Sequence, residues 1–190
     1  MTDKYFLNTE RLGFLFWQQS DLPLALSLWG DPAVTQFITA NGMNKEMVEQ
    51  RLHFEIAHRV EYNVQYWPVF LIETGEFIGC CGLRAYDAVP GDLEENVYEL
   101  GFHLKRVYWG KGYAKEAAEA VINYGFRVLH LKAIFAGHHP DNRSSAKLLK
   151  QLGFESGEDV FYPPTRLMHP SYLLKYKNIG NGVLGASASE

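Results

Sequence analysis

Asn96-Val-Tyr-Glu-Leu-Gly-Phe-His-Leu104 and, directly after it, Lys105-Arg-Val-Tyr-Trp-Gly-Lys-Gly112 decide the fold of this chain. The first segment predicts a strand and the second a tight loop. A long helix is predicted next, because apolar residues recur there at steps of three and four. This stripe comprises Ala114, Ala117, Ala118, Val121, Ile122, Gly125, Phe126 and Leu129. Polar residues fill the predicted opposite side, namely Lys115, Glu116, Glu119, Asn123 and Arg127.

Two glycines, Gly110 and Gly112, stand where the strand turns into the helix. Because glycine has no Cβ, backbone N–H groups there approach a ligand closely. The first N–H groups of a helix have no partner inside it and carry the positive end of its dipole. A strand, a glycine turn and a helix start therefore predict a cradle for an anion, most often phosphate. The alternative is a glycine turn that only connects strand to helix.

Two common phosphate motifs do not fit the loop. A Walker loop needs a glycine five residues before Gly110, where Lys105 stands, and Ser or Thr after the lysine, where Gly112 stands. A dinucleotide fingerprint needs a third glycine at Lys115. The anion is therefore not expected to belong to either class of nucleotide.

The composition of the 190 residues predicts one globular domain with a substantial core. A net charge of −4 and the absence of a long basic run argue against nucleic acid as a partner. We expect no signal peptide and no membrane span, because no apolar run approaches the length that either requires. Neighbouring Cys80 and Cys81 are expected to be buried and unpaired, as in a reducing cytoplasm.

The segments before residue 96 predict two helices and several strands. We expect a strand over residues 11–16, a helix over 22–28 capped by Asp21, and a break at Asp31-Pro32. Asn44 is expected to cap a helix over residues 45–62, whose Val48, Leu52, Ile56 and Val60 recur every four residues. Residues 67–72 and 77–86 predict a hairpin, and residues 88–95 an acidic loop.

The segments after the long helix predict a strand over residues 133–137 and a turn over 138–145 that opens another helix. Gly153 is expected to end that helix at its C′ position. Residues 154–161 and 166–176 predict a closing strand pair, interrupted by Pro163-Pro164. We expect one domain over residues 1–177 and a disordered tail over 178–190. This order predicts a mixed α/β sheet with helices on its faces.

A second motif makes the glycine loop more specific. Asn142 stands at a turn from strand to helix, and Ser145 and Leu152-Gly153-Phe154 follow it. With this motif and the glycine loop together, the chain resembles the GCN5-related N-acetyltransferases (the GNAT family), in the branch that includes ribosomal-protein N-terminal acetyltransferases. The resemblance extends over roughly residues 9–176. It also rests on Thr9-Glu10-Arg11-Leu12, Trp29-Gly-Asp-Pro32, Tyr108-Trp-Gly-Lys-Gly-Tyr-Ala114 and Glu116-Ala117.

The resemblance implies a mixed, mostly antiparallel central sheet, splayed between its middle strands, with helices on both faces. It implies acetyl-CoA as cosubstrate, with the pyrophosphate on the N–H groups of residues 109–114 and the pantetheine arm along β-strand backbone. The residues expected to bind acetyl-CoA are Phe102, Leu104, Val107, Trp109, Gly110, Lys111, Gly112, Tyr113, Ala114, Asn142 and Ser145.

Two positions depart from the family pattern. Val107 stands where the loop usually has Gln or Arg, which removes a side chain but leaves the backbone donors. Leu149 stands where many relatives carry a tyrosine proposed to protonate the departing thiolate. Ser145, one helical turn earlier on the same face, is the expected replacement acid. Its alternative role is to satisfy the start of the helix.

Glu99 is the carboxylate expected to accept the proton of the attacking amine. Strand alternation places it on one face with Gly101 and His103, and its alternative role is an ion pair between strands. A backbone amide near Leu104 is the expected oxyanion donor. His103 is expected to be a satisfied sheet histidine. We expect no metal at His138, His139 and Asp141, because adjacent residues of a strand point apart.

The predicted function is acetyl-CoA-dependent transfer of an acetyl group to a primary amine, first of all a protein or peptide N-terminus. The alternatives are a small-molecule amine, such as a polyamine or aminoglycoside, and an acyl-CoA sensor without turnover. Residues 92–95 of the acidic loop and the aromatic group of Phe37, Tyr62, Tyr66 and Trp67 are candidate acceptor contacts, although such groups are usually solvated surface or core. We expect a cytoplasmic monomer or homodimer.

Overall fold

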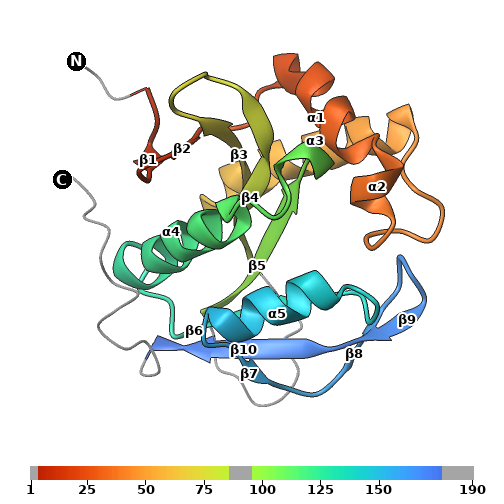
Figure 1. Ribbon diagram of the computed structural model, residues 1–190, viewed down its shortest axis with the longest axis vertical. Helices are drawn as coiled ribbons and strands as arrows, with labels where there is room; N and C mark the ends of the chain where they lie inside the picture. The colour runs from red at the N-terminus through yellow and green to blue at the C-terminus, as the bar shows by residue number, and fades with distance from the viewer. Residues whose placement is uncertain (1–3, 86–95, 177–190) are drawn as a thin grey trace.

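The computed structural model describes residues 4–85 and 96–176, which form an eight-stranded sheet, flanking helices and one small hairpin (Figure 1). The order of strands in the sheet is β1-β2-β3-β4-β5-β6-β10-β7. These strands are β1 Leu7–Asn8, β2 Leu12–Phe14, β3 Tyr66–Leu71, β4 Phe77–Ala85, β5 Val97–Leu104, β6 Ala133–Gly137, β7 Glu155–Ser156 and β10 Ser171–Lys175. The hairpin pairs β8, Val160–Tyr162, with β9, Leu167–His169.

The helices lie on both faces of the sheet, as expected. They are α1 Leu22–Trp29, α2 Pro32–Thr35, α3 Lys45–Tyr62, α4 Tyr113–Arg127 and α5 Arg143–Gln151, with short 3-10 turns η1, Gln19–Asp21, and η2, Arg106–Tyr108. Figure 1 shows α1, α2 and α3 grouped at one end of the molecule, away from α5. The mixed α/β architecture is confirmed.

The central sheet splays between β5 and β6. Every described strand pair in it is antiparallel except this one. The parallel register runs only over Val97↔Ala133, Tyr98↔Ile134 and Glu99↔Phe135. β5 continues to Leu104 with β4 still paired on its other side. The two strands therefore separate after Glu99, which confirms the splayed sheet that the resemblance implied.

Side-chain caps begin α3 and α2 where the sequence predicts a start or a break, whereas the predicted cap of α1 is absent. The Asn44 side chain accepts the N–H of Met47, and α3 has the predicted bounds. Asp31 accepts the N–H of Ala33 and starts α2, a short helix that the sequence analysis missed. Asp21 precedes α1, but its carboxylate accepts the N–H of Gln18, so it closes η1 instead of capping α1.

The predicted stripe of α3 is wrong at its C-terminal end. Leu52 is 2% exposed, whereas Val60 is 84% exposed. Glu55 and His58 are buried instead of Ile56 and Val60. A step of four residues overshoots a helical turn by about 40°, so three such steps rotate a side chain by about 120° away from the buried face.

Two further predictions need correction. Asn123, expected on the polar side of α4, is buried, because α4 packs on four strands of the sheet and its covered face is wider than the apolar stripe. The closing strand pair is broken into four short strands, of which β7 pairs with β10, and β8 with β9. Pro170 interrupts the second segment, since it has no N–H to donate to a ladder. Tyr86, the acidic loop and the C-terminal tail lie outside the described residues.

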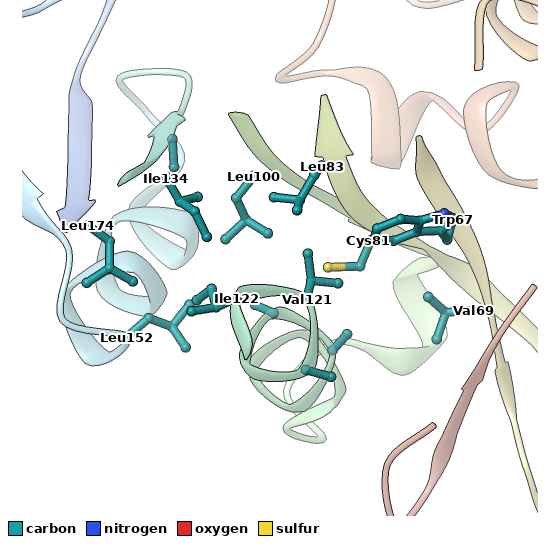
Figure 2. Packing of buried hydrophobic residues seen from close by; sticks show 14 of the residues in the cluster. Trp67, Val69, Cys81, Leu83, Leu100, Val121, Ile122, Ile134, Leu152 and Leu174 are labelled. Carbon is teal, nitrogen blue, oxygen red and sulfur yellow. The ribbon is translucent and has the colours of Figure 1, made fainter. Parts of the chain in front are cut away.

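Alternation along the strands divides the core into two layers. Trp67 of β3 and Cys81 of β4 pack in the larger cluster with α4 and α5 (Figure 2). Their neighbours Tyr66 and Cys80 pack in the cluster with α1 and α3. Both cysteines are free and buried, as predicted.

We predict opposite outcomes for two substitutions in α3. Leu52→Ala should lower the free energy of unfolding by about 2–5 kcal/mol, because it leaves a cavity in the core. Val60→Ala should change it by no more than about 0.5 kcal/mol. Urea denaturation followed by circular dichroism measures both values. Equal losses in the two variants would contradict the burial pattern described above.

Candidate active site

A cavity of about 750 Å³ lies where β5 and β6 separate. Both predicted catalytic residues, Glu99 and Ser145, line it, and so do Gly110, Gly112 and Asn142. The glycine loop and α4 follow β5 in the chain, and α5 follows β6, so both helix starts arrive at the opening between these strands. The structure thus brings the two sequence motifs into one site.

The edge of β5 presents backbone groups to this cavity. The N–H of Lys105 donates to the carbonyl of Ile78 in the β4 segment at 2.9 Å. Because successive residues of a strand alternate, the N–H and C=O of Phe102 point away from β4, toward the opening. Phe102 and Leu104 both line the cavity. The carbonyl of Leu104 already accepts the indole N–H of Trp109 at 2.7 Å.

The glycine loop has the conformation that the anion cradle requires. Gly110 and Gly112 have φ angles of +73° and +83°, in the left-handed region that favours glycine. A Cβ on Gly110 would meet nothing within 4 Å, so this backbone faces open space. Gly112 is the N-cap of α4 and no side chain caps the helix. The donors at the start of α4 are therefore available to an anion.

Two predicted loop residues do not line the cavity. Val107 lies in η2 with 67% of its surface exposed. The Lys111 ammonium lies 5.5 Å from the centroid of the Tyr108 ring. Lys115, which the sequence analysis assigned only to the polar face of α4, lines the cavity from the first turn of that helix. Its position one helical turn after Gly112 could have indicated from the sequence that Lys115 lies at the cavity.

A network from the turn between β1 and β2 holds the start of α4. The hydroxyl of Thr9 donates to Glu116 Oε1, and Arg11 Nε donates to Glu116 Oε2 at 2.6 Å. Partial burial acts to raise the pKa of Glu116, but the hydrogen bonds from Thr9 and Arg11 outweigh it and lower this pKa. Arg11 also donates to the carbonyl of Lys111 in the loop. Residues 9–11 and Glu116, on which the family resemblance also rests, are therefore in direct contact.

Glu99 is held by a tyrosine from β3. The Tyr66 hydroxyl donates to Glu99 Oε2 at 3.0 Å. Burial, and then the negative charge of Glu99, raise the pKa of Tyr66 well above its usual value, so the phenol keeps its proton. The Tyr66 ring lies over Gly101, where a Cβ would be 2.1 Å from Cζ. Glycine at this position therefore lets the tyrosine reach the carboxylate.

His103 is neutral in this site. Burial lowers its pKa well below the usual value, and the positive charges of Arg51 and Arg84 lower it further. Its Nδ1 accepts the indole N–H of Trp29 at 3.2 Å, which leaves the proton on Nε2. His103 therefore has no free acceptor nitrogen. Among the described residues that line the cavity, Glu99 is the sole carboxylate.

Asn142 and Ser145 divide two tasks at the start of α5. The Asn142 side-chain oxygen accepts the backbone N–H of Ser145 at 3.0 Å and caps the helix. The side-chain NH₂ of Asn142 remains to donate. Within residues 4–85 and 96–176 the Ser145 hydroxyl has no hydrogen-bond partner, and Ser145 lines the cavity. The cap is therefore supplied by asparagine and not by the serine hydroxyl.

The candidate aromatic group separates across the sheet. Tyr66 and Phe37 line the cavity, whereas Trp67 is fully buried in the larger core cluster. Tyr62, at the end of α3, packs against that same cluster. Alternation along β3 places Tyr66 and Trp67 on opposite faces.

The histidines near residue 140 have different hydrogen-bond partners. His138 hydrogen-bonds the hydroxyl of Tyr172 at 3.3 Å, whereas the His139 ring accepts the N–H of Asp141. No group of three or more potential metal ligands occurs among the residues that the structure describes. Nor does any helix within those residues have the length and apolar character to cross a membrane.

A buried ion cluster that the sequence analysis missed borders the cavity. Glu55 of α3 is fully buried, and its Oε1 accepts Arg51 Nε at 2.7 Å and Arg84 Nη2 at 2.8 Å. Its Oε2 accepts the backbone N–H of Tyr66 at 2.8 Å. The spacing of Arg51 and Glu55, one helical turn apart, was the only feature of the sequence that could have predicted an ion pair here. Arg84 comes from β4, so its place in the cluster depends on the sheet.

Comparison with known proteins supports an acyltransferase site. The family model of the acetyltransferase (GNAT) domain matches residues 11–155. The chain is 32% identical over 154 residues to uncharacterized N-acetyltransferase p20 of Bacillus licheniformis, which covers 78% of this chain and 82% of that protein. It is 41% identical over 90 residues to the ribosomal protein uS5-alanine N-acetyltransferase of Escherichia coli, covering 47% of this chain and 44% of that protein. The structure of Mycobacterium smegmatis RimJ in complex with CoA-disulfide aligns with a TM-score of 0.73 at 17% identity, covering 91% of this chain and 86% of that one.

The Glu55 cluster predicts a pH dependence of stability. Burial acts to raise the pKa of Glu55, but Arg51, Arg84 and the hydrogen bonds it accepts outweigh burial, and its pKa lies below the usual 4.5. A carboxyl with a lower pKa in the folded state stabilises the fold above the unfolded value, and this stabilisation is lost as the pH falls through the folded value. Glu55→Gln should therefore lower the free energy of unfolding at neutral pH, and its difference from the wild type should shrink as the pH falls below 4.5.

Urea unfolding at several pH values measures this difference. Glu61→Gln, an exposed change in the same helix, is the control and should have little effect at any pH. A difference between Glu55→Gln and the wild type that does not vary with pH would contradict the prediction.

Proposed function

This chain belongs to the GNAT acetyltransferase family, and from that premise we propose that it transfers the acetyl group of acetyl-CoA to the primary amine of a protein or peptide N-terminus. The single observation that carries the proposal is the cavity between β5 and β6, where the glycine loop, Glu99 and Ser145 meet. We place the reaction in a reducing cytoplasm, which suits two free, buried cysteines.

Two backbone elements and one side chain would hold the coenzyme. The N–H groups of the glycine loop and the start of α4 suit its pyrophosphate. The edge of β5 at Phe102 suits the pantetheine arm, whose amides hydrogen-bond like an added strand. The Asn142 amide approaches from the α5 side. The similar RimJ structure contains CoA-disulfide, which supports the same choice of ligand.

Glu99 would accept the proton that the amine loses. As the amine nitrogen bonds to the thioester carbonyl carbon, one N–H proton passes to Glu99, directly or through a water. The Tyr66 hydroxyl holds the carboxylate in place for this transfer. Neutral His103 cannot take the role, because Trp29 occupies its acceptor nitrogen.

Ser145 would supply the proton to the leaving group. When the carbon–sulfur bond breaks, the thiolate takes a proton from the Ser145 hydroxyl, which takes one in turn from water, while Glu99 releases the proton of the amine to water. The products are an N-acetyl amine and free coenzyme A. Leu149, buried one turn later on α5, has no proton to donate. The absence of a described partner on the serine hydroxyl supports this assignment.

An N-terminal amine is favoured as acceptor by similarity and by chemistry. The E. coli relative is named for acetylation of an alanine of ribosomal protein uS5. An α-amino group has a pKa of ~8 and is partly neutral at physiological pH, whereas lysine has a pKa of ~10.4. A single carboxylate base therefore suits the α-amine better.

Coenzyme binding tests the cradle. Gly110→Ala should weaken CoA binding at least about tenfold, because a methyl group enters the open side of the loop and alanine disfavours its positive φ. Gly75→Ala, at a φ of +69° in the β3–β4 turn away from the cavity, introduces the same backbone strain and should leave binding unchanged. Titration calorimetry measures both. Wild-type protein that takes up no CoA would refute the proposed function.

Kinetics test the two catalytic residues. Glu99→Gln and Ser145→Ala should each lower kcat by about 10²–10⁴-fold, the usual range for a proton-transfer group, with little change in CoA affinity. Ser144→Ala, at a neighbouring residue that also lines the cavity, is the control and should retain activity. Release of free thiol with an N-terminal peptide panel gives the rates. If Glu99→Gln and Ser145→Ala keep wild-type rates, both roles are wrong.

A further inference from the structure

Two arginines share one carboxylate at the end of the cavity beside Glu99. Arg51 and Arg84 both donate to Glu55 Oε1, and both line the cavity, whereas Glu55 does not. Two guanidinium groups and one carboxylate leave one net positive charge. We call the part of the cavity around Glu99 the acceptor end, because the amine would lie there. The positive charge lies next to it, since Arg84 and Glu99 are paired across β4 and β5.

The two guanidinium groups are held in place but not fully satisfied. Their side chains are only 13% and 19% exposed. Aromatic rings pack on them, with Arg84 4.3 Å from the Tyr66 ring centroid and Arg51 5.1 Å from that of Trp29. Arg51 Nη2 and Arg84 Nε are buried and have no hydrogen-bond partner in the described part of the chain. Buried unpaired donors of a cation favour an anionic partner.

The rest of the acceptor end carries little charge. Burial, followed by the positive charges of Arg51 and Arg84, lowers the pKa of His103 and keeps it neutral. Burial, followed by His139 and His138, lowers the pKa of His169 to about 4, so it is neutral at physiological pH. Glu99 is then the one carboxylate that the described lining offers, and the arginine pair is the positive group beside it, whereas Lys115 and Lys147 line the cavity from α4 and α5.

We propose that the acceptor is an amine that also carries a carboxylate, with the amine at Glu99 and the carboxylate on Arg51 and Arg84. The inference rests on the proposed acetyl transfer and adds the substrate class. Planar guanidinium groups bind carboxylates in a fixed geometry. A polyamine or aminoglycoside would instead bring further positive charge toward the two arginines. The carboxylate is either the α-carboxylate of a free amino acid or the acidic side chain of the first residue of a peptide.

Matched acceptors test this on the wild-type enzyme. The first arm compares free amino acids with their amides, the second compares peptides that begin with Asp or Glu with those that begin with Asn or Gln, and the third contains polyamines. We expect kcat/KM at least tenfold higher for the carboxylate member in the first or second arm, and the arm that responds identifies the source of the carboxylate. Equal values within each pair, or faster turnover of polyamines, would overturn the inference while leaving the acetyl transfer intact.

Variants of the arginines separate binding from a purely structural role. Arg51→Lys and Arg84→Lys keep the positive charge beside Glu55 but lose the planar fork. Each should raise KM at least fivefold for the carboxylate acceptor and leave KM for the amide unchanged. Arg59→Lys, in the same helix but packed on the Phe16 ring away from the cavity lining, is the control. Equal changes in KM for both acceptors would show that the arginines only hold Glu55.

A binding measurement keeps the inference testable if no amine is acetylated. In that case the proposed function fails. Calorimetry of the protein with CoA and an N-acetyl amino acid, compared with its amide, then tests the arginine pair directly. At least tenfold tighter binding of the carboxylate form supports the inference, and equal binding refutes it.

Discussion

The separation of β5 from β6 after Glu99 is the constraint on which the site depends. A parallel pair that stayed together to Leu104 would satisfy the backbone of both strands and leave no opening. Because the pair ends early, the backbone of β5 beyond Glu99 faces a cavity. The helices that follow these two strands, α4 and α5, begin at the same opening. The uncapped start of α4 and the asparagine-capped start of α5 supply the polar groups of this opening.

Tyr66 connects the buried ion cluster to the proposed base. Its backbone N–H donates to Glu55, its ring covers Gly101, and its hydroxyl donates to Glu99. The two arginines that neutralise Glu55 also pack on its ring. The position of Glu99 in the cavity is therefore set by residues of α3, β3 and β4, and the charge at the acceptor end is set by the same cluster.

Local sequence patterns predicted the bounds of a helix or strand well where these bounds depend only on residues within that element. The bounds of α3 and of β6 agree with the predicted residues, because a side-chain cap and a short apolar run are local signals. Val60 and Asn123 were placed on the wrong faces, since the direction in which a helix is covered depends on its neighbours. Within the site, Glu99, Gly110, Gly112, Asn142 and Ser145 meet as expected, whereas Val107 and Lys111 do not reach the cavity.

The sequence by itself determined the strand, the glycine turn and the helix of the cradle, the asparagine that starts α5, and through these the family. Each of these features depends on backbone conformation or on spacing within a few residues, which the chain carries locally. Only the tertiary structure decided where β5 leaves β6, which side chain holds Glu99, and that Arg51 and Arg84 border the acceptor end. Those contacts join residues far apart in the chain, and the packing of helices on a splayed sheet brings them together.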